Sequence, residues 1–306
     1  MSRIMQSLVL GSLLAGCVRH SPASSEPSGM QRLDAVSTST TPELVARQFN
    51  LRAVERGFTP PGGDAVASPN GGPGTATPFG LYVLALSWAP NFCCSHPGKG
   101  ECQGLDGSFG ANHLTLHGLW PNYTDAEAQQ TGATYPLYCA PYGSCKRTPS
   151  PECSPDPSTL PDSMKTYGPG YVSDNNFLAN HEWPKHGSCT GLDSRTYFSA
   201  ALSALKNLPG DQGTPDLLKN NIGGTVLAMD LQKAFGNPES VMLSCDANCN
   251  LMQVSICLAN GPSGQPAARM ACPDNTTNSA YDNGCFVNNC KTVTIQAANQ
   301  CGAGGP

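Results

Sequence analysis

The folded part of the chain begins where a polar stretch rich in Pro and Gly gives way to an apolar run. Residues 79–88, FGLYVLALSW, are almost continuously apolar, which predicts a strand buried on both faces. Residues 113–120, HLTLHGLW, alternate instead, so a strand there would place His113, Thr115 and His117 on one side. We therefore expect two strands with different burial early in the folded region.

Helical periodicity is found in the second half of the chain. Residues 196–207 predict a helix with Asp193 or Ser194 as its N-cap. Residues 226–235 predict a second helix, and residues 214–220 predict a shorter one with Thr as cap and Pro at the first helical position.

A hairpin and a cysteine-rich loop complete the predicted elements. Residues 241–245 and 251–257 have the character of strands, and the turn between them, CDANCN, carries two cysteines. Residues 139–163 contain three Cys and six Pro, which predicts a loop held by disulfides. Because strands and helices are interspersed without regular alternation, the pattern indicates an α+β protein.

The stretch before residue 79 has a different composition. Residues 17–78 are dominated by Ser, Thr, Pro and Gly and contain too few apolar groups for a packed core, so we interpret them as a tether. Within the tether, residues 41–58 predict a short amphipathic helix that docks loosely.

The first sixteen residues resemble a secretory signal. The apolar run from Ile4 to Leu14 is shorter than the roughly 18 residues that span a bilayer, so residues 1–16 predict a signal peptide rather than a membrane helix. The sequence LAGC, ending at Cys17, resembles a bacterial lipobox, in which the cysteine is lipidated and becomes the first mature residue. The alternative is an ordinary signal peptide followed by an incidental cysteine. We expect an extracytoplasmic protein, anchored to a membrane through Cys17 or secreted if Cys17 carries no lipid.

Cysteine count and charge narrow the picture further. The chain has 15 cysteines, and removing Cys17 leaves 14, which allows seven pairs in an oxidising compartment. Charged residues make up 13% of the chain, with 22 acidic against 17 basic residues and no long run of one sign. The surface as a whole does not attract a polyanion, so a polyanionic ligand has to be held by a local site.

The densest group of ionisable residues is the stretch HEWPKHGSC at 181–189. If a helix begins here, four side chains share an arc of about 140°: His181, Glu182, Lys185 and His186. Pro184 is tolerated in the first turn of a helix, which predicts that the group lies at a helix N-terminus, where bound anions are favoured.

Two alternatives to a catalytic site exist for this stretch. A helical zinc motif places its two histidines four residues apart, whereas these are five apart and diverge, so a metal site is disfavoured. A salt-bridged start of a helix, with Cys189 in a disulfide, also fits the stretch taken alone.

A second histidine segment changes this balance. LTLHGLWPNY at 114–123 places His117 on a strand, and like the first segment it has Gly after the histidine and Trp nearby. His117 alone fits a core histidine equally well. A pair of imidazoles, however, can act as base and acid near neutral pH, and an added cation and carboxylate suit a reaction that develops charge on phosphorus oxygens.

LTLHGLWP and HEWPKHGSC resemble the two active-site segments of the ribonuclease T2 family. Residues 79–93 and 251–257 are similar to that family's opening and late core strands, and the resemblance spans about residues 79–273. It implies an α+β fold with a central antiparallel sheet, packed helices and many disulfides. It also implies endonucleolytic cleavage of single-stranded RNA through a 2′,3′-cyclic phosphate to a 3′-phosphate, with broad base preference and no metal or other cofactor.

The resemblance assigns a role to each residue of the two segments. His186 would be the general base for the ribose 2′-OH, and His117 the general acid for the 5′-oxygen that leaves. Glu182 and Lys185 would stabilise the pentacoordinate phosphate, and His181 would bind phosphate as an auxiliary group.

Base binding is implied for two more residues. Trp120 and Asn122 match positions that hold the base on the 5′ side of the cut, where an aromatic face stacks any base. Asn both donates and accepts hydrogen bonds, so it leaves base preference open, and simple packing is the alternative for Trp120. His113 is either a partner of His117 or a solvated histidine. Cys189 is expected to form a disulfide with the cluster at 139–153.

The expected protein is thus a monomeric, lipid-anchored ribonuclease whose partner is single-stranded RNA. Residues 79–273 would form the catalytic domain, and residues 274–306, which depart from the family core and carry three Cys, a disulfide-held appendage. The alternative function is a ribonuclease-like binding or toxin module whose effect does not depend on catalysis.

Overall fold

The computed structural model describes residues 78–146, 150–279 and 281–300. The predicted signal peptide, Cys17, the tether and the helix at 41–58 lie outside these residues. Within the described part of the chain, no helix has the length and apolar character needed to cross a membrane.

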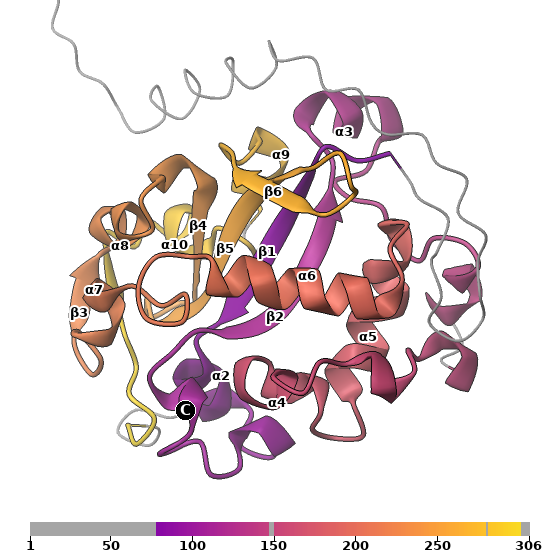
Figure 1. The fold of residues 1–306 in the computed structure, drawn as a ribbon. Coiled ribbons are helices and arrows are strands. Elements are labelled where there is room, and N and C mark those ends of the chain that lie inside the picture. Colours follow the sequence, from indigo (N-terminus) through magenta and orange to yellow (C-terminus); the bar gives the residue numbers. More distant parts are fainter. Residues whose placement is uncertain (1–77, 147–149, 280, 301–306) are drawn as a thin grey trace, which may run out of the picture. The chain divides into compact units, whose positions relative to one another are not determined.

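An antiparallel sheet forms the centre of the described region (Figure 1). Its strands follow the order β2-β1-β5-β4, and β6 pairs with β5. The strands are β1 (Leu81–Ser87), β2 (Thr115–Asn122), β4 (Val241–Cys245), β5 (Leu251–Asn260) and β6 (Pro266–Arg269). The strands predicted at 79–88 and 113–120 and the hairpin of β4 and β5 are thereby confirmed, as is the α+β class.

Both faces of β1 are buried, as its continuous apolar run predicts. Tyr82, Leu84 and Leu86 belong to the main core, which lies between the sheet and helix α6 (Ser194–Lys206). Leu81, Val83 and their neighbours of the opposite face form a second, smaller cluster, against which Trp120 packs. Figure 1 shows α6 crossing in front of the sheet.

The predicted helices of the second half are present, although two of them start later than predicted: residues 226 and 227 belong to a strand, and the helix predicted at 214–220 starts at Asp216. In α6, Asp193 is the N-cap, and its carboxylate accepts a hydrogen bond from the backbone N–H of Thr196. Helix α8 (Ala228–Ala234) follows strand β3 (Thr225–Leu227), which pairs with β7 (Thr292–Thr294).

Helix α7 (Asp216–Lys219) begins later than predicted, because Pro215 rather than Thr214 occupies the N-cap position. The Thr214 hydroxyl instead accepts a hydrogen bond from the backbone of Leu114, so a tertiary contact has replaced the expected cap.

Short helices and 3₁₀ turns make up the remaining regular structure. The other α-helices are α2 (Ala89–Ser95), α3 (Asp125–Thr131), α4 (Met164–Tyr167), α5 (Phe177–Lys185), α9 (Asp274–Thr277) and α10 (Gly284–Val287). The 3₁₀ turns are η1 (Gly100–Cys102), η2 (Phe109–Ala111), η3 (Tyr142–Lys146), η4 (Pro151–Cys153), η5 (Pro157–Thr159), η6 (Pro169–Tyr171), η7 (Gly187–Cys189) and η8 (Pro238–Ser240).

Disulfides tie these elements to the sheet. Six pairs join described residues: Cys93–Cys102, Cys139–Cys189, Cys145–Cys153, Cys245–Cys285, Cys249–Cys290 and Cys257–Cys272. Cys94 is disulfide-bonded as well. The predicted link from Cys189 to the 139–153 cluster is confirmed.

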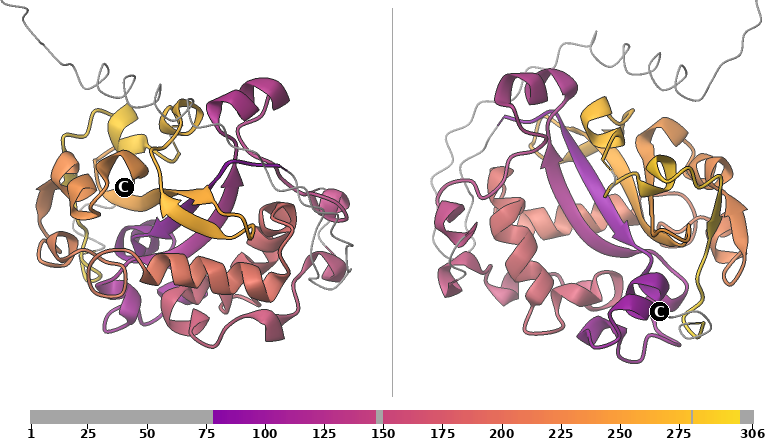
Figure 2. Two further views of the ribbon diagram at one scale, coloured as in Figure 1. Left: turned by 45° about the horizontal axis from the view of Figure 1, so that its top comes forward. Right: turned by 180° about the vertical axis from the view of Figure 1, so that it is seen from behind.

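The chain after residue 273 packs against the rest of the described region. Two of the disulfides join it to β4 and to the turn that follows β4, and its residues Val293 and Ile295 are buried in the main core. Figure 2 shows this part of the chain in yellow along the outer strands, from two further sides. The boundary at 273 stays a prediction.

Candidate active site

A helix ends within the stretch 181–189, whereas the sequence predicted that a helix begins there. Helix α5 starts at Phe177, after Asn176, whose side chain makes no cap hydrogen bond, and it ends at Lys185. The ionisable side chains therefore occupy its C-terminal turns. The positive end of the helix dipole is not available to them, and a bound anion has to be held by side chains instead.

The C-terminal end of α5 is fixed by contacts at its proline and at the residues that follow it. Pro184 has no N–H to donate within the helix, and its carbonyl accepts a hydrogen bond from the Ser188 hydroxyl at 2.8 Å. That hydroxyl also accepts a hydrogen bond from the backbone N–H of Cys139 at 3.1 Å, beside the Cys139–Cys189 disulfide. The position of the following histidine is thus set by a segment some fifty residues away in sequence.

His117 sits at a bulge in the edge strand β2. Gly118 pairs with Ala85 and Leu116 pairs with Leu86, so His117 is an extra residue without a partner in β1. Bulges bend a strand and re-aim a side chain, and this one interrupts the simple alternation on which the sequence prediction depended. The side chain of His117 reaches across β1 to the strand on its other side, β5.

The Nδ1 atom of His117 is held by a residue that neither motif contains. Its Nδ1 donates a hydrogen bond to Oε1 of Gln253 on β5 at 2.9 Å, and the Gln253 amide in turn donates to the Ser255 hydroxyl at 2.9 Å. This leaves Nε2, which lies 4.0 Å from Oε1 of Glu182, without a proton in the neutral ring. The only sequence signal for Gln253 is a long polar side chain within the apolar strand LMQVSIC.

The unpaired edge of β2 is closed by two buried tyrosines. The hydroxyl of Tyr171 donates to the carbonyl of His117, and that of Tyr197 donates to the carbonyl of Leu119, both at 2.8 Å. These bonds stabilise the backbone on either side of the bulge. Neither tyrosine was predicted to belong to the site.

Glu182 is the buried centre of the group, with only 1% of its side chain exposed. Its Oε1 lies 4.0 Å from Nε2 of His117 and 4.0 Å from Nε2 of His181. Its Oε2 accepts a hydrogen bond of 2.6 Å from the indole N–H of Trp120. One carboxylate therefore contacts both predicted active-site segments.

Gly118 makes this contact possible. A Cβ atom at this position would lie 2.3 Å from Nε1 of Trp120 and 2.5 Å from Oε2 of Glu182, much closer than van der Waals contact permits. The glycine after the histidine in HGLWP is thus required by the approach of α5 to β2.

His186 is buried between aromatic rings. It is 3% exposed, its ring centroid lies 5.4 Å from that of Trp120 and 5.6 Å from that of Tyr135, and its Nδ1 has no hydrogen-bond partner in the described structure. The ring of His117 lies 5.3 Å from Trp120. Trp120 therefore contacts both imidazoles, and it does not present its indole N–H to solvent.

Burial lowers the pKa values of His117 and His186 and raises that of Glu182. It lowers the pKa of His117 to about 4, although the hydrogen bond to Gln253 acts the other way. Burial, and then the charge of Lys185, hold the pKa of His186 well below its ordinary value. Burial raises the pKa of Glu182 to about 7, against the effects of Trp120 and Lys185. Near neutral pH the two imidazoles are uncharged, and the carboxyl is partly protonated.

The structure brings six of the predicted residues together, which we call the active-site cluster: His117, Trp120, His181, Glu182, Lys185 and His186. His117 and His181 remain partly exposed, at 23% and 43%.

Two candidates lie apart from the active-site cluster. The side chain of Asn122 is buried and bonded to the backbone N–H of Tyr123 and to Thr276. His113 precedes β2 and lies 3.1 Å from Asp211, which also binds Lys219.

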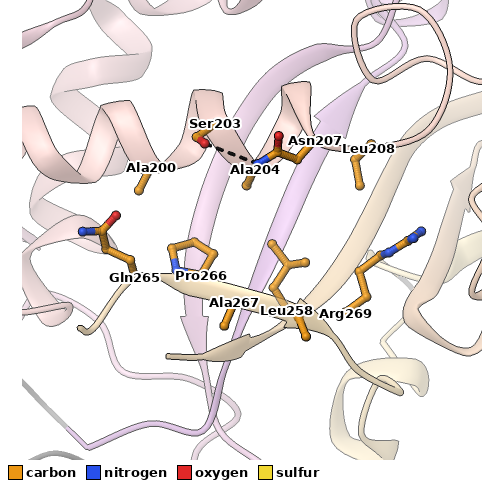
Figure 3. Close-up of a pocket in the computed structure, with 11 residues that line it drawn as sticks. Ala200, Ser203, Ala204, Asn207, Leu208, Leu258, Gln265, Pro266, Ala267 and Arg269 are labelled. Carbon is orange, nitrogen blue, oxygen red and sulfur yellow. Dashed lines mark hydrogen bonds between the residues drawn. The ribbon is translucent and has the colours of Figure 1, made fainter. Parts of the chain in front are cut away.

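Neither a cavity elsewhere in the described region nor the potential metal-binding groups of that region give a further candidate site. A cavity of about 250 Å³ between α6 and β6, lined by Ala204, Leu258 and Arg269 among others, includes none of its residues (Figure 3). Among the described residues, no three His, Cys, Asp or Glu side chains are grouped so that they could hold a metal ion.

Comparison with known proteins agrees with the two segments. A sequence model described as the Ribonuclease T2 family matches residues 79–265. Ribonuclease I of Escherichia coli (strain K12) is 29% identical over 193 residues, which cover 56% of this chain and 71% of that protein. Intracellular ribonuclease LX of Solanum lycopersicum is 25% identical over 238 residues, covering 68% and 90%.

Solved structures of ribonucleases also align with the chain. The crystal structure of Actibind, a T2 ribonuclease, gives a TM-score of 0.48 at 17% identity, covering 78% of this chain and 94% of that one. Ribonuclease MC1 from bitter gourd seeds gives 0.41 at 21% identity, covering 63% and 94%.

The family match includes both histidine segments and the whole active-site cluster, and it extends over more than half of the chain. The chain belongs to the ribonuclease T2 family, whose members are metal-independent endoribonucleases.

Proposed function

We propose that this endoribonuclease cleaves single-stranded RNA in two steps, first to a 2′,3′-cyclic phosphate and then to a 3′-phosphate. The observation that carries the proposal is the meeting of His117 and His186, from distant segments, on the ring of Trp120 beside the buried carboxyl of Glu182. Acid–base catalysis of a phosphodiester exchange needs two such groups within reach of one phosphate.

In the first step, His186 is the base. Its lowered pKa keeps the imidazole neutral, so it can accept the proton of the ribose 2′-OH as the oxygen attacks phosphorus. His117 donates a proton from Nε2 to the 5′-oxygen as the P–O5′ bond breaks. In the second step the roles reverse: His117 takes a proton from the water whose oxygen attacks phosphorus, and His186 returns one to the 2′-oxygen as the P–O2′ bond breaks.

His117 has to be protonated for the first step, although burial lowers its pKa. A bound phosphate supplies the missing stabilisation, because a negative charge near Nε2 favours the imidazolium. Lysine at position 185 balances the same phosphate charge. The low basic content of the surface is compatible with this, since the counter-charge is local.

The partly protonated carboxyl of Glu182 suits the pentacoordinate phosphate. With its pKa raised to about 7, Glu182 in its protonated form can donate a hydrogen bond to a phosphate oxygen instead of repelling it. Trp120 occupies Oε2, which leaves Oε1 facing His117 and His181. His181, the most exposed of the three cluster histidines, is proposed to bind phosphate before and after the reaction.

Base contact and location complete the proposal. Trp120 offers its aromatic ring to the base on the 5′ side of the cut, which supports broad preference. Asn122 was predicted to assist, but its buried amide offers no support for this. Six disulfides among the described residues fit an extracytoplasmic protein. A lipid on Cys17 is proposed from the sequence alone and is tested by mass spectrometry of the mature N-terminus.

Digestion of defined dinucleotides tests the chemistry directly. The oxidised protein, incubated with ApU and UpU in EDTA, is expected to release uridine and a 2′,3′-cyclic phosphate, which then converts to the 3′-monophosphate. The matching deoxydinucleotides are expected to remain intact, because they lack the attacking 2′-OH. Loss of cleavage in EDTA, or direct formation of 5′-phosphates, would contradict the proposal.

A further inference from the structure

The chain after residue 273 reaches the active-site cluster. We call residues 274–279 and 281–290 the C-terminal segment; it follows the region matched by the family model, which ends at residue 265. We propose that Tyr281 of this segment forms part of the subsite for the base on the 5′ side of the cut, in place of Asn122. This inference rests on the proposed function and names a residue that determines its specificity.

The C-terminal segment is anchored where β2 ends. The carboxylate of Asp125, in the first turn of α3, accepts hydrogen bonds from the backbone N–H groups of Asp274 at 3.1 Å and Asn275 at 2.8 Å. The Asn275 amide donates to the carbonyl of Tyr123 at 2.9 Å. Figure 1 shows α9 and α3 at the same end of the sheet. These bonds place the first turn of the segment directly beside the end of the HGLWPNY motif.

This anchoring covers the side chain of Asn122. Trp120 and Asn122 are two residues apart on β2, so both belong to the same face of the strand. Asn122 is nevertheless only 4% exposed, and its amide lies 3.4 Å from the hydroxyl of Thr276, which is itself fully buried. Its Oδ1 accepts from the backbone of Tyr123. Both polar atoms are thus directed to the protein, and neither is available to read the edge of a base.

The same segment places an exposed aromatic ring near Trp120. The ring centroids of Tyr281 and Trp120 are 6.2 Å apart, with 39° between the planes, and Tyr281 is 61% exposed. Partial burial and the nearby charge of Glu182 raise the pKa of Tyr281, which agrees with a position close to the catalytic carboxyl. A base that contacts the Trp120 ring next to the cleavage point therefore meets Tyr281 as well.

The segment is held firmly enough to position this ring. The Cys245–Cys285 and Cys249–Cys290 disulfides tie it to β4 and the turn after it. Within it, the Asn283 amide donates to the carbonyl of Thr277 at 2.9 Å. Two aromatic rings without an edge-reading amide discriminate by stacking, which is stronger for large bases. The expected preference is accordingly for purines over pyrimidines on the 5′ side, with both accepted.

Steady-state kinetics of Tyr281→Ala and Tyr281→Phe test this inference. Hydrolysis of 2′,3′-cyclic AMP and 2′,3′-cyclic UMP isolates the base in question, because these substrates have no nucleotide on the other side. For Tyr281→Ala we expect KM for the adenine substrate to rise about 5- to 100-fold, the range for loss of one stacking partner, and to rise less for the uracil substrate. The kcat values should stay within about twofold. Tyr281→Phe, which keeps the ring, should resemble the parent protein.

Phe286→Ala is the matched control. Phe286 is a similarly exposed ring, at 55%, on helix α10 of the same segment, and it makes no ring contact with the active-site cluster among the described residues. We expect its kinetics to equal those of the parent, and thermal unfolding of all variants to confirm intact folds. An unchanged adenine KM in Tyr281→Ala, in a protein whose parent cleaves normally, overturns this inference alone. A parent protein that does not hydrolyse either substrate contradicts the proposed function instead.

Discussion

His117 and Gln253 are joined across an intervening strand: Nδ1 of the imidazole donates a hydrogen bond of 2.9 Å to the side-chain carbonyl of Gln253 on β5, on the far side of β1. The β-bulge at position 117 makes the reach possible. Gln253 is held from behind by Ser255, so the imidazole has one defined orientation and one defined tautomer. Its role in the proposed chemistry is to position His117 rather than to touch substrate.

Replacing Gln253 is expected to misalign the acid. Gln253→Ala should lower kcat about 10- to 100-fold, the range expected for a misplaced catalytic group, with a smaller change in KM. Gln253→Glu keeps the acceptor and adds a negative charge, which raises the pKa of His117. It should therefore recover much of kcat and shift the alkaline limb of the pH–rate profile to higher pH. If kcat falls equally in both variants and their pH–rate profiles are unshifted, the role of Gln253 is purely structural.

The two proposed acid–base residues should be separable from a nearby histidine. We expect His117→Ala and His186→Ala each to lose at least about 100-fold in kcat on dinucleotides. His113→Ala is the control, because His113 binds Asp211 and lies outside the active-site cluster, and it should keep full activity. If both inactive variants retain the biological effect of the protein, the effect depends on binding, and the toxin or binding-module alternative is correct.

Glu182 should make folding stability depend on pH in a defined direction. Its pKa rises from 4.5 to about 7 on folding, so the protonated form is favoured in the folded state. The stabilisation that the raised pKa of Glu182 gives to the folded state is fully present below about pH 4.5 and is lost as pH rises through about 7. Glu182→Gln removes this titration and keeps an acceptor for Trp120. Urea unfolding at pH 5 and pH 8 measures the free energy of unfolding of both proteins. Relative to the parent, the free energy of unfolding of Glu182→Gln should be higher at pH 8 than at pH 5 by up to about 3 kcal/mol. A difference that is the same at both pH values would contradict the buried titration.

Gly118 is expected to tolerate no side chain. In Gly118→Ala, the added methyl group would displace Trp120 or Glu182, whose 2.6 Å hydrogen bond it would otherwise overlap. We expect kcat/KM to fall at least about 10-fold, since small displacements of reacting groups are costly. Gly98→Ala is the matched control, because a Cβ there has no neighbour within 4 Å, and its activity should be unchanged. Normal kinetics in Gly118→Ala would show that α5 and β2 can separate without penalty.

Local patterning was sufficient for the main secondary structure. The apolar run of β1, the hairpin of β4 and β5 and the capped helix α6 were all predicted, because burial and capping leave direct marks in neighbouring residues. The start of α5 was not predicted. Asn176 offers no side-chain cap, and the proline within 181–189 suggested a first turn where the structure has the last one.

The residues of the active-site cluster were predicted from two motifs, but their arrangement was not. The bulge at His117, the bond to Gln253 and the closure of the β2 edge by Tyr171 and Tyr197 all depend on strand register and on contacts between distant segments. The burial of Asn122 by the C-terminal segment is of the same kind. The sequence by itself thus determined which ionisable groups are available for the proposed chemistry, since residue type sets acidity and charge. Only the tertiary structure decided which of them meet, which are buried and how their pKa values shift, because pairing and exclusion of water are set by parts of the chain that lie far apart in sequence.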